Sequence, residues 1–344
     1  MTSLSDGPSR ATMRDVAALA GVSLKTVSRV VNGESGVSAD VRDRVAAAVL
    51  RLDYRPNLAA SNLRRTVART GLLGALVQDL SNSYSAGLLR ALEDGARPHR
   101  TAVLAASLDE GIERERELVH DLVSRRVDGL VIMPASERQD YLVTELRSGP
   151  PVVFVDRPPR GIVADSVMVD HALGARLAAA HLLEQGHRRV AGLFHLARIS
   201  TVQDRLAGYR AAHEALGLTP DPGLVVTDLS TADEAAAAVL ALLDLADPPT
   251  AIFAGRNILA AGAVAALAER GLRRTVALVG FDDFPLADLL DPPLTVIRQD
   301  VGRIGRTAAE MVFGRIGGDT QTPRQVVIEP TLVTRGSGEI PPPA

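Results

Sequence analysis

The sequence predicts an α/β protein with a small all-α head at the N-terminus and a larger, two-lobed body built on parallel sheets. Residues 1–70 contain 11 Lys and Arg against 6 Asp and Glu, whereas residues 71–344 contain 27 against 35. The basic part has apolar residues at helical spacing, and the acidic part alternates short apolar runs with amphipathic stretches. This alternation recurs along the chain, which predicts right-handed βαβ units in each of two lobes.

The composition excludes several classes of protein. The 344 residues are 46% hydrophobic and 23% charged, as in ordinary globular proteins. The absence of cysteine excludes disulfides, thiol nucleophiles and cysteine zinc sites. No uninterrupted apolar run reaches ~18 residues, and the first residues lack the apolar core of a secretory signal, so we expect neither a membrane span nor export. A basic head on an acidic body is typical of nucleic-acid binding by the head.

The head is predicted to contain a helix-turn-helix. Thr12 can cap a helix over Met13–Ala20, and Gly21 suits the left-handed position that ends it. A second helix over 24–32 begins after a three-residue turn, and such a second helix can enter a major groove. A third helix places its apolar residues at helical spacing: Val41, Val45, Val49 and Leu52.

The segment after the third helix has unusual features. Pro56 in the run Tyr54–Asn57 ends the helix, and the stretch 58–65 is too short to be a stable helix by itself. Leu63 next to Arg64 is an unusual pair for a plain linker. It suits an apolar wedge inserted between base steps in a minor groove.

The body's elements follow from its alternating pattern. The expected strands are the short apolar runs 72–77, 102–106, 129–133, 152–155, 190–194, 224–226, 251–254 and 276–280. The expected helices cover 85–97, 112–124, 137–147, 206–216, 231–246, 259–270 and 302–316. Ligands of open parallel sheets bind beyond the carboxyl ends of the strands, which predicts a binding cleft between the lobes.

An enzyme has little support in the sequence. No Gly-x-Gly-x-x-Gly follows a strand, no Walker-type phosphate loop is present, and Gly71–Gly74 opens a strand rather than a helix. The histidines show no metal-ligand spacing: His171, His181, His187 and His195. We therefore expect no catalytic residues, no metal and no cofactor.

Three runs in the head carry a family resemblance: Ala11–Ala17, Gly21–Ser23 and Thr26–Asn32. Together they resemble the DNA-binding head of the lactose-repressor (LacI/GalR) family, and the segment from Tyr54 past Leu63 resembles that family's hinge. The resemblance implies a DNA-binding head over 1–55 and a hinge over 56–70.

We expect the DNA contacts to divide by position. Base readout is expected from the exposed face of the second helix: Leu24, Lys25 and Arg29. Contacts to the DNA backbone are expected from Ser23, Thr26, Asn32 and Tyr54. Minor-groove contacts are expected from Leu63 and Arg64.

The body extends the resemblance through the runs 79–84, 126–130, 155–158, 186–189, 205–209 and 280–283. It implies a periplasmic-binding-protein-like body over 71–344, with the first lobe at about 71–168 and 299–325 and the second lobe at about 169–298 and 326–338. The implied effector-binding residues are Asp79, Tyr84, Asp156, Thr201, Arg205, Leu229, Asn257 and Asp282. Alternatively, Asp156 caps a turn and Arg205 forms a structural ion pair with Asp282.

The effector's chemistry is only partly implied. This chain has Ile199 and Leu229 where the purine-binding member has an arginine and an aromatic residue, which argues against a purine. A sugar or sugar derivative is expected instead. Arg256 stands where sugar-binding members more often have a neutral polar residue. It either binds an anionic effector or pairs with Asp282 or Asp283.

These observations predict a cytoplasmic transcriptional regulator, expected to be a repressor, whose affinity for double-stranded operator DNA is controlled by a small-molecule effector. The tail 335–341 has no heptads, so we expect a homodimer rather than a coiled-coil tetramer. The alternative is a solute-binding protein of a transport system, which the basic head and the expected lack of export argue against. A sugar-processing enzyme would need a catalytic constellation that the sequence lacks.

Overall fold

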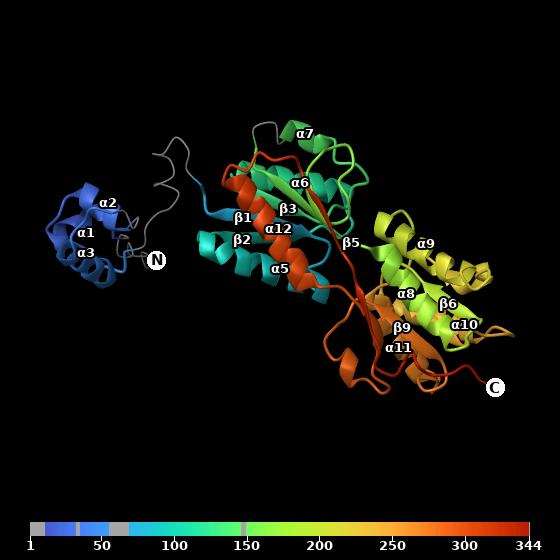
Figure 1. The fold of residues 1–344 in the computed structure, drawn as a ribbon. Coiled ribbons are helices and arrows are strands. Elements are labelled where there is room, and N and C mark those ends of the chain that lie inside the picture. Colours follow the sequence, from blue (N-terminus) through green and yellow to red (C-terminus); the bar gives the residue numbers. More distant parts are fainter. Residues whose placement is uncertain (1–10, 32–34, 55–68, 146–148, 344) are drawn as a thin grey trace, which may run out of the picture. The chain divides into compact units, whose positions relative to one another are not determined.

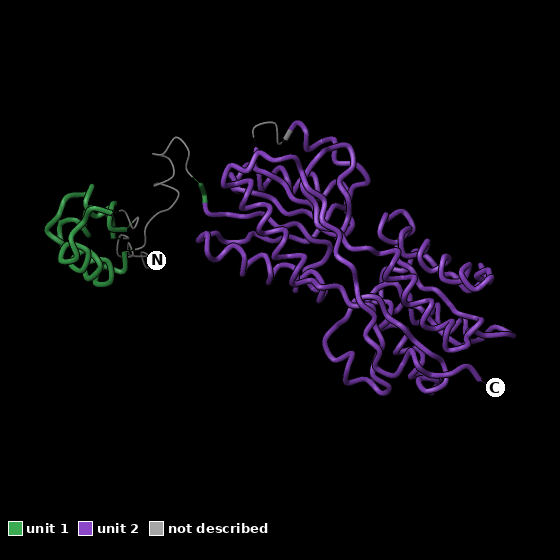
Figure 2. Tube along the Cα trace, in the orientation of Figure 1, with its two compact units in different colours: residues 1–70 green, residues 71–344 purple. Residues whose placement is uncertain are grey.

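The computed structural model describes residues 11–31, 35–54, 69–145 and 149–343, and the chain divides into two compact units (Figure 2). We call residues 1–70 the head and residues 71–344 the body. Within the described ranges, no helix is long and apolar enough to cross a membrane.

The head contains three helices: α1 (Met13–Ala20), α2 (Leu24–Val31) and α3 (Ala39–Arg51). Thr12 and Asp15 form a reciprocal capping box at the start of α1, which satisfies two backbone donors. Gly21 takes φ 63° at the end of α1, a left-handed conformation that glycine adopts without strain. The helices share a small buried core of Val16, Ala17, Ala20, Val27, Val45, Ala48 and Tyr54.

The first lobe of the body is a six-stranded parallel sheet in the order β11-β5-β4-β3-β1-β2. Its strands are β1 (Leu72–Val77), β2 (Ala102–Ser107), β3 (Gly129–Ile132), β4 (Val152–Asp156), β5 (Asp165–Val169) and β11 (Gln325–Ile328). Its helices are α5 (Ser83–Ala96), α6 (Ile112–Ser124), α7 (Tyr141–Glu145) and α12 (Val301–Ile316), with η1 (Arg97–His99) after α5.

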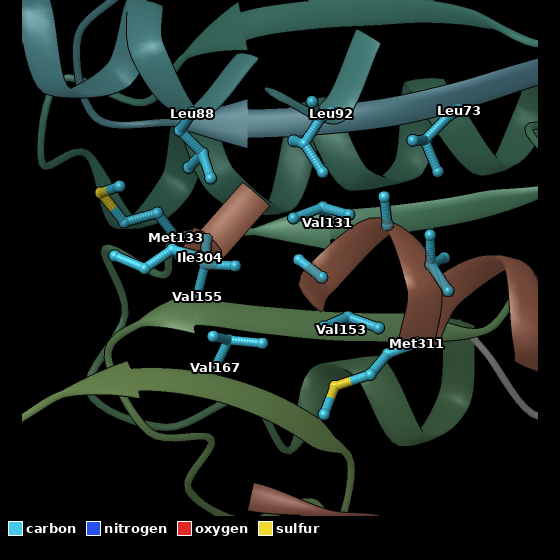
Figure 3. Close-up of a cluster of buried hydrophobic side chains, with 14 of the residues drawn as sticks. Leu73, Leu88, Leu92, Val131, Met133, Val153, Val155, Val167, Ile304 and Met311 are labelled. Atoms are coloured by element: carbon cyan, nitrogen blue, oxygen red, sulfur yellow. The ribbon is translucent and has the colours of Figure 1, made fainter. Parts of the chain in front are cut away.

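Helices α5 and α12 lie side by side on one face of this sheet (Figure 1). Their apolar side chains form one buried cluster with the strands, which includes Leu88, Ile304, Val131 and Val153 (Figure 3). A separate cluster covers the opposite face with residues of α6 and α7. This sandwich of helices around a parallel sheet is what the alternating sequence pattern predicts.

The second lobe repeats the plan in the order β12-β10-β9-β8-β6-β7, parallel except for the antiparallel edge strand β12. Its strands are β6 (Val190–Leu193), β7 (Val225–Val226), β8 (Ala251–Ala254), β9 (Ala277–Phe281), β10 (Thr295–Arg298) and β12 (Thr331–Val333). Its helices are α8 (His171–Glu184), α9 (Ser200–Glu214), α10 (Ala232–Leu243) and α11 (Asn257–Glu269), with η2 (Pro222–Leu224) and η3 (Ala287–Leu289) in loops.

One expected lobe boundary is wrong. The second lobe was expected to resume at residue 326, but β11 pairs with β5 in the first sheet as far as the Ile328–Val169 pair. The last crossing between the lobes therefore lies between β11 and β12, after the earlier crossings between β5 and α8 and between β10 and α12. Strand β11 covers the edge of the first sheet that β5 would otherwise expose, and β12 does the same for β10 in the second sheet.

The prediction did not contain helix α8 or strands β5, β10 and β12. Helix α8 is rich in Ala and Leu, and it is buried against both α9 and the second sheet, so it shows no amphipathic stripe. Strand β5 begins with the buried polar residues Asp165 and Ser166. Arg315 and Arg324 bind the Asp165 carboxylate, a distant partnership that no local pattern reveals.

Candidate functional site

The start of helix α2 presents exposed side chains. Leu24 is 42% exposed, and Lys25 is exposed beside it. Ser23 Oγ accepts a hydrogen bond from Thr26 N at 3.1 Å and lies 2.8 Å from Thr26 Oγ1. Ser23 therefore caps α2, while its neighbours Leu24 and Lys25 remain available to a partner.

Arg29 has a structural contact that the sequence did not indicate. Its Nη2 donates a hydrogen bond to the carbonyl oxygen of Ser35 at 2.8 Å. Arg29 is half-buried and faces the turn that follows α2. This contact forms because the chain returns past the Arg29 side chain before α3, and the expected base contact of Arg29 remains a prediction.

The expected contact between Tyr54 and the DNA backbone does not fit the position of this residue. It is buried in the head's core, since the chain turns back at the end of α3 and places the ring against the helices. This position does not suit a DNA contact. The predicted contacts Asn32, Leu63 and Arg64 lie outside the described residues.

The body contains two adjoining cavities between its lobes, of about 730 Å³ and about 50 Å³. Both lie at the carboxyl ends of the parallel strands, as the topology predicts. Residues from both lobes line the two cavities together: Gln78, Asn82, Glu110, His195 and Arg256.

The cavities bring together most of the predicted effector residues. Asp79 and Asn257 line the larger cavity. The smaller cavity is lined by Tyr84, Asp156, Thr201, Arg205 and Asp282. Leu229 is a correction: it lines neither cavity, because its side chain packs in the second lobe's apolar core. Only its carbonyl faces a cavity residue, lying 2.6 Å from His195 Nδ1.

Polar contacts join the two lobes beside these cavities. The side chains of Asn82 and Asn257 exchange two hydrogen bonds, of 2.9 and 3.2 Å. Arg198 donates to the carbonyl oxygen of Glu110 at 3.1 Å. These contacts are polar, so a ligand that changes the spacing of the lobes must break or exchange these hydrogen bonds.

A chain of three charged or polar side chains also crosses between the lobes. Asp156 ends β4 with φ 68°, and its Oδ1 lies 3.3 Å from Nε2 of His171, which opens α8. Arg205 Nη2 lies 3.1 Å from the other imidazole nitrogen, Nδ1. A guanidinium can only donate, so Nδ1 accepts and the proton of a neutral His171 is on Nε2, facing Asp156.

Burial alone would raise the pKa of Asp156, but the facing imidazole of His171 and the charges of Arg157 and Arg205 outweigh it and lower the pKa from 3.8 to about 2. A folded-state pKa below the unfolded value stabilises the fold above pH ~4, and the contribution of about 2 kcal/mol is lost as the pH falls toward 2.

We expect urea unfolding at several pH values to show this loss of stability. The stability difference between wild type and Asp156→Asn should shrink between pH 5 and pH 3, and a constant difference would contradict the assignment.

The alternative that Arg205 forms a structural ion pair with Asp282 is wrong, because both side chains have other partners. Arg205 Nη1 donates to the carbonyl oxygen of Gly255 at 2.7 Å, and the guanidinium lies 3.9 Å from the ring centre of Phe281. Asp282 instead accepts a hydrogen bond from Gln299 Nε2. Neighbouring residues thus fix the Arg205 side chain, and its Nε has no hydrogen-bond partner among the described residues.

Four polar atoms around the smaller cavity have no hydrogen-bond partner among the described residues: Tyr84 Oη, Arg157 Nε, Arg205 Nε and Gln299 Oε1. Burial raises the pKa of Tyr84 well above its usual range, with Asp156 and Asp282 adding to the effect, so its hydroxyl stays protonated. Each unsatisfied buried group costs roughly 1–3 kcal/mol. A ligand with several hydroxyl groups can both donate and accept hydrogen bonds, and so offers partners of both kinds to these atoms.

Sequence reasoning missed several residues of this site. Glu110 follows β2, and the rule that sites gather at the carboxyl ends of strands could have found it. His171 and Gln299 follow β5 and β10, two strands that the prediction did not contain. No group of three or more His, Asp or Glu side chains within the described ranges could hold a metal ion.

Known proteins resemble both units. Residues 12–57 match the model of bacterial regulatory proteins, lacI family, and residues 179–338 match a periplasmic binding protein-like domain. The chain is 32% identical over 329 residues to the ribose operon repressor of Haemophilus influenzae, covering 95% of this chain and 98% of that protein. It is 33% identical over 328 residues to the transcriptional regulator GalS of Salmonella typhimurium, covering 95% and 96%. The lac repressor dimer bound to operator and the anti-inducer ONPF matches with TM-score 0.84 and 29% identity, covering 95% of this chain and 99% of that one.

Proposed function

Because the chain belongs to the LacI family of bacterial regulatory proteins, we propose that its head binds operator DNA and that its body binds a small-molecule effector that controls this binding. The relatives that match along 95% of the chain are regulators rather than transport proteins or enzymes. We place the protein in the cytoplasm, where its DNA is, and assign it no catalytic activity.

The observation that carries the effector function is the set of unpartnered polar atoms between the lobes. Tyr84, Arg205 and Gln299 offer donors and acceptors in a space that a hydroxyl-rich ligand would fill. Asp156, Thr201 and Asp282 line the same cavity. A sugar or sugar derivative has this chemistry, and the relative from Haemophilus influenzae is named for the ribose operon.

In this proposal, α2 enters the major groove of the operator. Leu24, Lys25 and Arg29 contact base edges there, while Ser23, Thr26 and Asn32 contact the backbone and Leu63 and Arg64 the minor groove. A homodimer presents two heads to successive half-sites of a near-palindromic operator. Effector binding changes the equilibrium between lobe arrangements, which changes the affinity of the heads for the operator.

An operator selection tests the proposal directly. The full chain, incubated with a randomised duplex library, should enrich a near-palindromic site and bind it with a steep dependence on salt. A panel of sugars and sugar derivatives, screened by thermal shift, should contain compounds that raise the melting temperature and change the affinity for the enriched site. Failure to enrich any site would overturn the DNA-binding assignment.

Lys25 offers a sharp test of the recognition face. Lys25→Ala should weaken operator binding by about 10- to 100-fold, the cost of about 1–3 kcal/mol for one base contact, and should relax preference at particular base pairs. The stability of the head should not change, because the side chain is exposed. Fluorescence anisotropy on single-base variants of the operator measures both effects.

Arg97→Ala is the matched control for Lys25→Ala. It removes one positive charge from an exposed side chain of the body, so operator affinity should stay within twofold. A loss that is equal for all operator variants would make Lys25 a phosphate contact. Lys25 is also the only lysine of the chain, so protection of its amine from acylation by bound operator reports this contact directly.

A further inference from the structure

Arg256 lies where the two cavities of the body adjoin, immediately before helix α11. Its one side-chain hydrogen bond among the described residues runs from Nη1 to Nε2 of His195, at 3.2 Å. No carboxylate of the described chain pairs with it. The alternative that Arg256 forms an ion pair with Asp282 or Asp283 is therefore wrong.

His195 does not neutralise this charge. The guanidinium donates, so His195 Nε2 must accept, and the proton of the imidazole is on Nδ1, which donates to the carbonyl oxygen of Leu229 at 2.6 Å. Burial, together with the charge of Arg256, lowers the pKa of His195 and keeps the ring neutral. Arg256 thus retains a full positive charge beside a neutral partner.

The carboxylates near Arg256 are bound to other residues. Glu110 accepts two hydrogen bonds from Arg157, of 2.7 and 2.6 Å, and Asp282 accepts one from Gln299. Both attract Arg256 through space without contacting it. Asp283 accepts hydrogen bonds from Arg298 and Arg335.

Two further features favour an anion at this position. Arg256 is the N-cap residue of α11, whose 13 residues direct the positive end of the helix dipole toward the cavity. Burial penalises the charged form of Arg256 and lowers its pKa. A negatively charged group of a ligand would offset the free-energy cost of burying this charge. A guanidinium also suits carboxylate and phosphate because it can donate two parallel hydrogen bonds.

We propose that the effector is an anionic sugar derivative, whose carboxylate or phosphate pairs with Arg256 while its hydroxyl groups occupy the smaller cavity. This inference rests on the proposed function, because it describes the ligand of the same site. The larger cavity, of about 730 Å³, leaves room for the charged group beside Arg256.

Matched ligand pairs test the proposal on the full chain without DNA. The probes are ribose and ribose 5-phosphate, glucose and glucose 6-phosphate, and glucose and glucuronate, each titrated by calorimetry. The ligand that binds best should be an anionic member, about tenfold or more tighter than its neutral parent, because a charge-assisted hydrogen bond adds that much affinity. The phosphate and carboxylate arms identify which anion Arg256 prefers.

Variants of Arg256 test whether this side chain causes the tighter binding of anionic ligands. Arg256→Asn should remove the anion preference, and Arg256→Lys should keep part of it, because it keeps the charge without the planar fork. Arg97→Asn is the control, because this exposed residue lies outside the cavities, and it should bind like wild type. Circular dichroism establishes that each variant is folded.

The proposal is overturned if a neutral sugar binds as tightly as its anionic partner, or if Arg256→Asn keeps the anion preference. Inorganic phosphate tests the anion site even if the effector is not among the sugars of the panel. At matched ionic strength it should raise the melting temperature of wild type more than that of Arg256→Asn, and an equal shift also overturns the proposal. If a neutral sugar releases the operator, the proposed function stands and only the anionic effector is refuted. If the operator selection fails, the ligand titrations still test the preference for an anion, because they use no DNA.

Discussion

Removing residues 1–70 should lower operator affinity by about 1,000-fold or more, to the level of non-specific binding or below it. The remaining body contains 27 Lys and Arg against 35 Asp and Glu, so its net charge of -8 repels DNA phosphates. The fragment 71–344 should stay folded, because it forms a compact unit with its own apolar clusters. Fluorescence anisotropy with the selected operator measures the loss.

The control for this experiment is effector binding. The cavities and their lining residues all lie within 71–344, so the fragment should bind the effector with the affinity of the full chain. Sequence-specific binding of the operator by the fragment would refute the assignment of DNA recognition to the head. Loss of effector binding would instead show that the body needs the head in order to fold or assemble.

Gly208→Ala should destabilise the body by about 3 kcal/mol, because overpacking a tight helix contact costs roughly 1–3 kcal/mol and this contact involves backbone. Gly208 lies in the middle of α9, where a Cβ atom would stand 2.1 Å from the carbonyl oxygen of Ala172 and 3.0 Å from the amide nitrogen of Arg176. Both belong to α8, so the two helices would have to separate. Urea unfolding of the variant and wild type gives the difference in free energy.

Gly314→Ala is the matched control in α12. Its nearest neighbours would be 3.8 Å from the new Cβ atom, so no backbone must move. Replacing a glycine inside a helix should then stabilise the body by about 0.5–1 kcal/mol. Equal stabilities of Gly208→Ala and wild type would show that α8 and α9 separate without cost.

The same substitution should also disturb the effector site. Arg205 lies about one turn before Gly208 on α9, and His171 opens α8, so separating these helices strains the hydrogen bond between Arg205 and His171. We expect weaker effector binding by Gly208→Ala even at temperatures where it is folded. Packing between α8 and α9 therefore connects the stability of the second lobe to the geometry of its binding residues.

Local signals predicted the elements whose ends are marked in the sequence. Thr12 and Gly21 delimit α1 because a side-chain cap and a left-handed glycine act over one turn of helix. Helix α6 has the bounds that its amphipathic pattern indicates, since one face packs on the sheet and the other faces solvent. Helix α5 begins at Ser83, two residues before its predicted start, because the Asn82 side chain caps it by accepting a hydrogen bond from Tyr84 N.

Patterns in the sequence alone predicted the two-unit organisation, the alternating α/β plan, the helix-turn-helix and the position of the binding cleft at strand ends. Tertiary structure decided which side chains meet there. Leu229 is buried in the core, Arg205 contacts His171 and Gly255 rather than Asp282, and Arg256 meets a neutral imidazole instead of a carboxylate. Helix caps and apolar periodicity act between neighbours in sequence, whereas these partnerships join residues from 34 to 61 positions apart. Their choice depends on strand order and helix packing, which only the folded chain specifies.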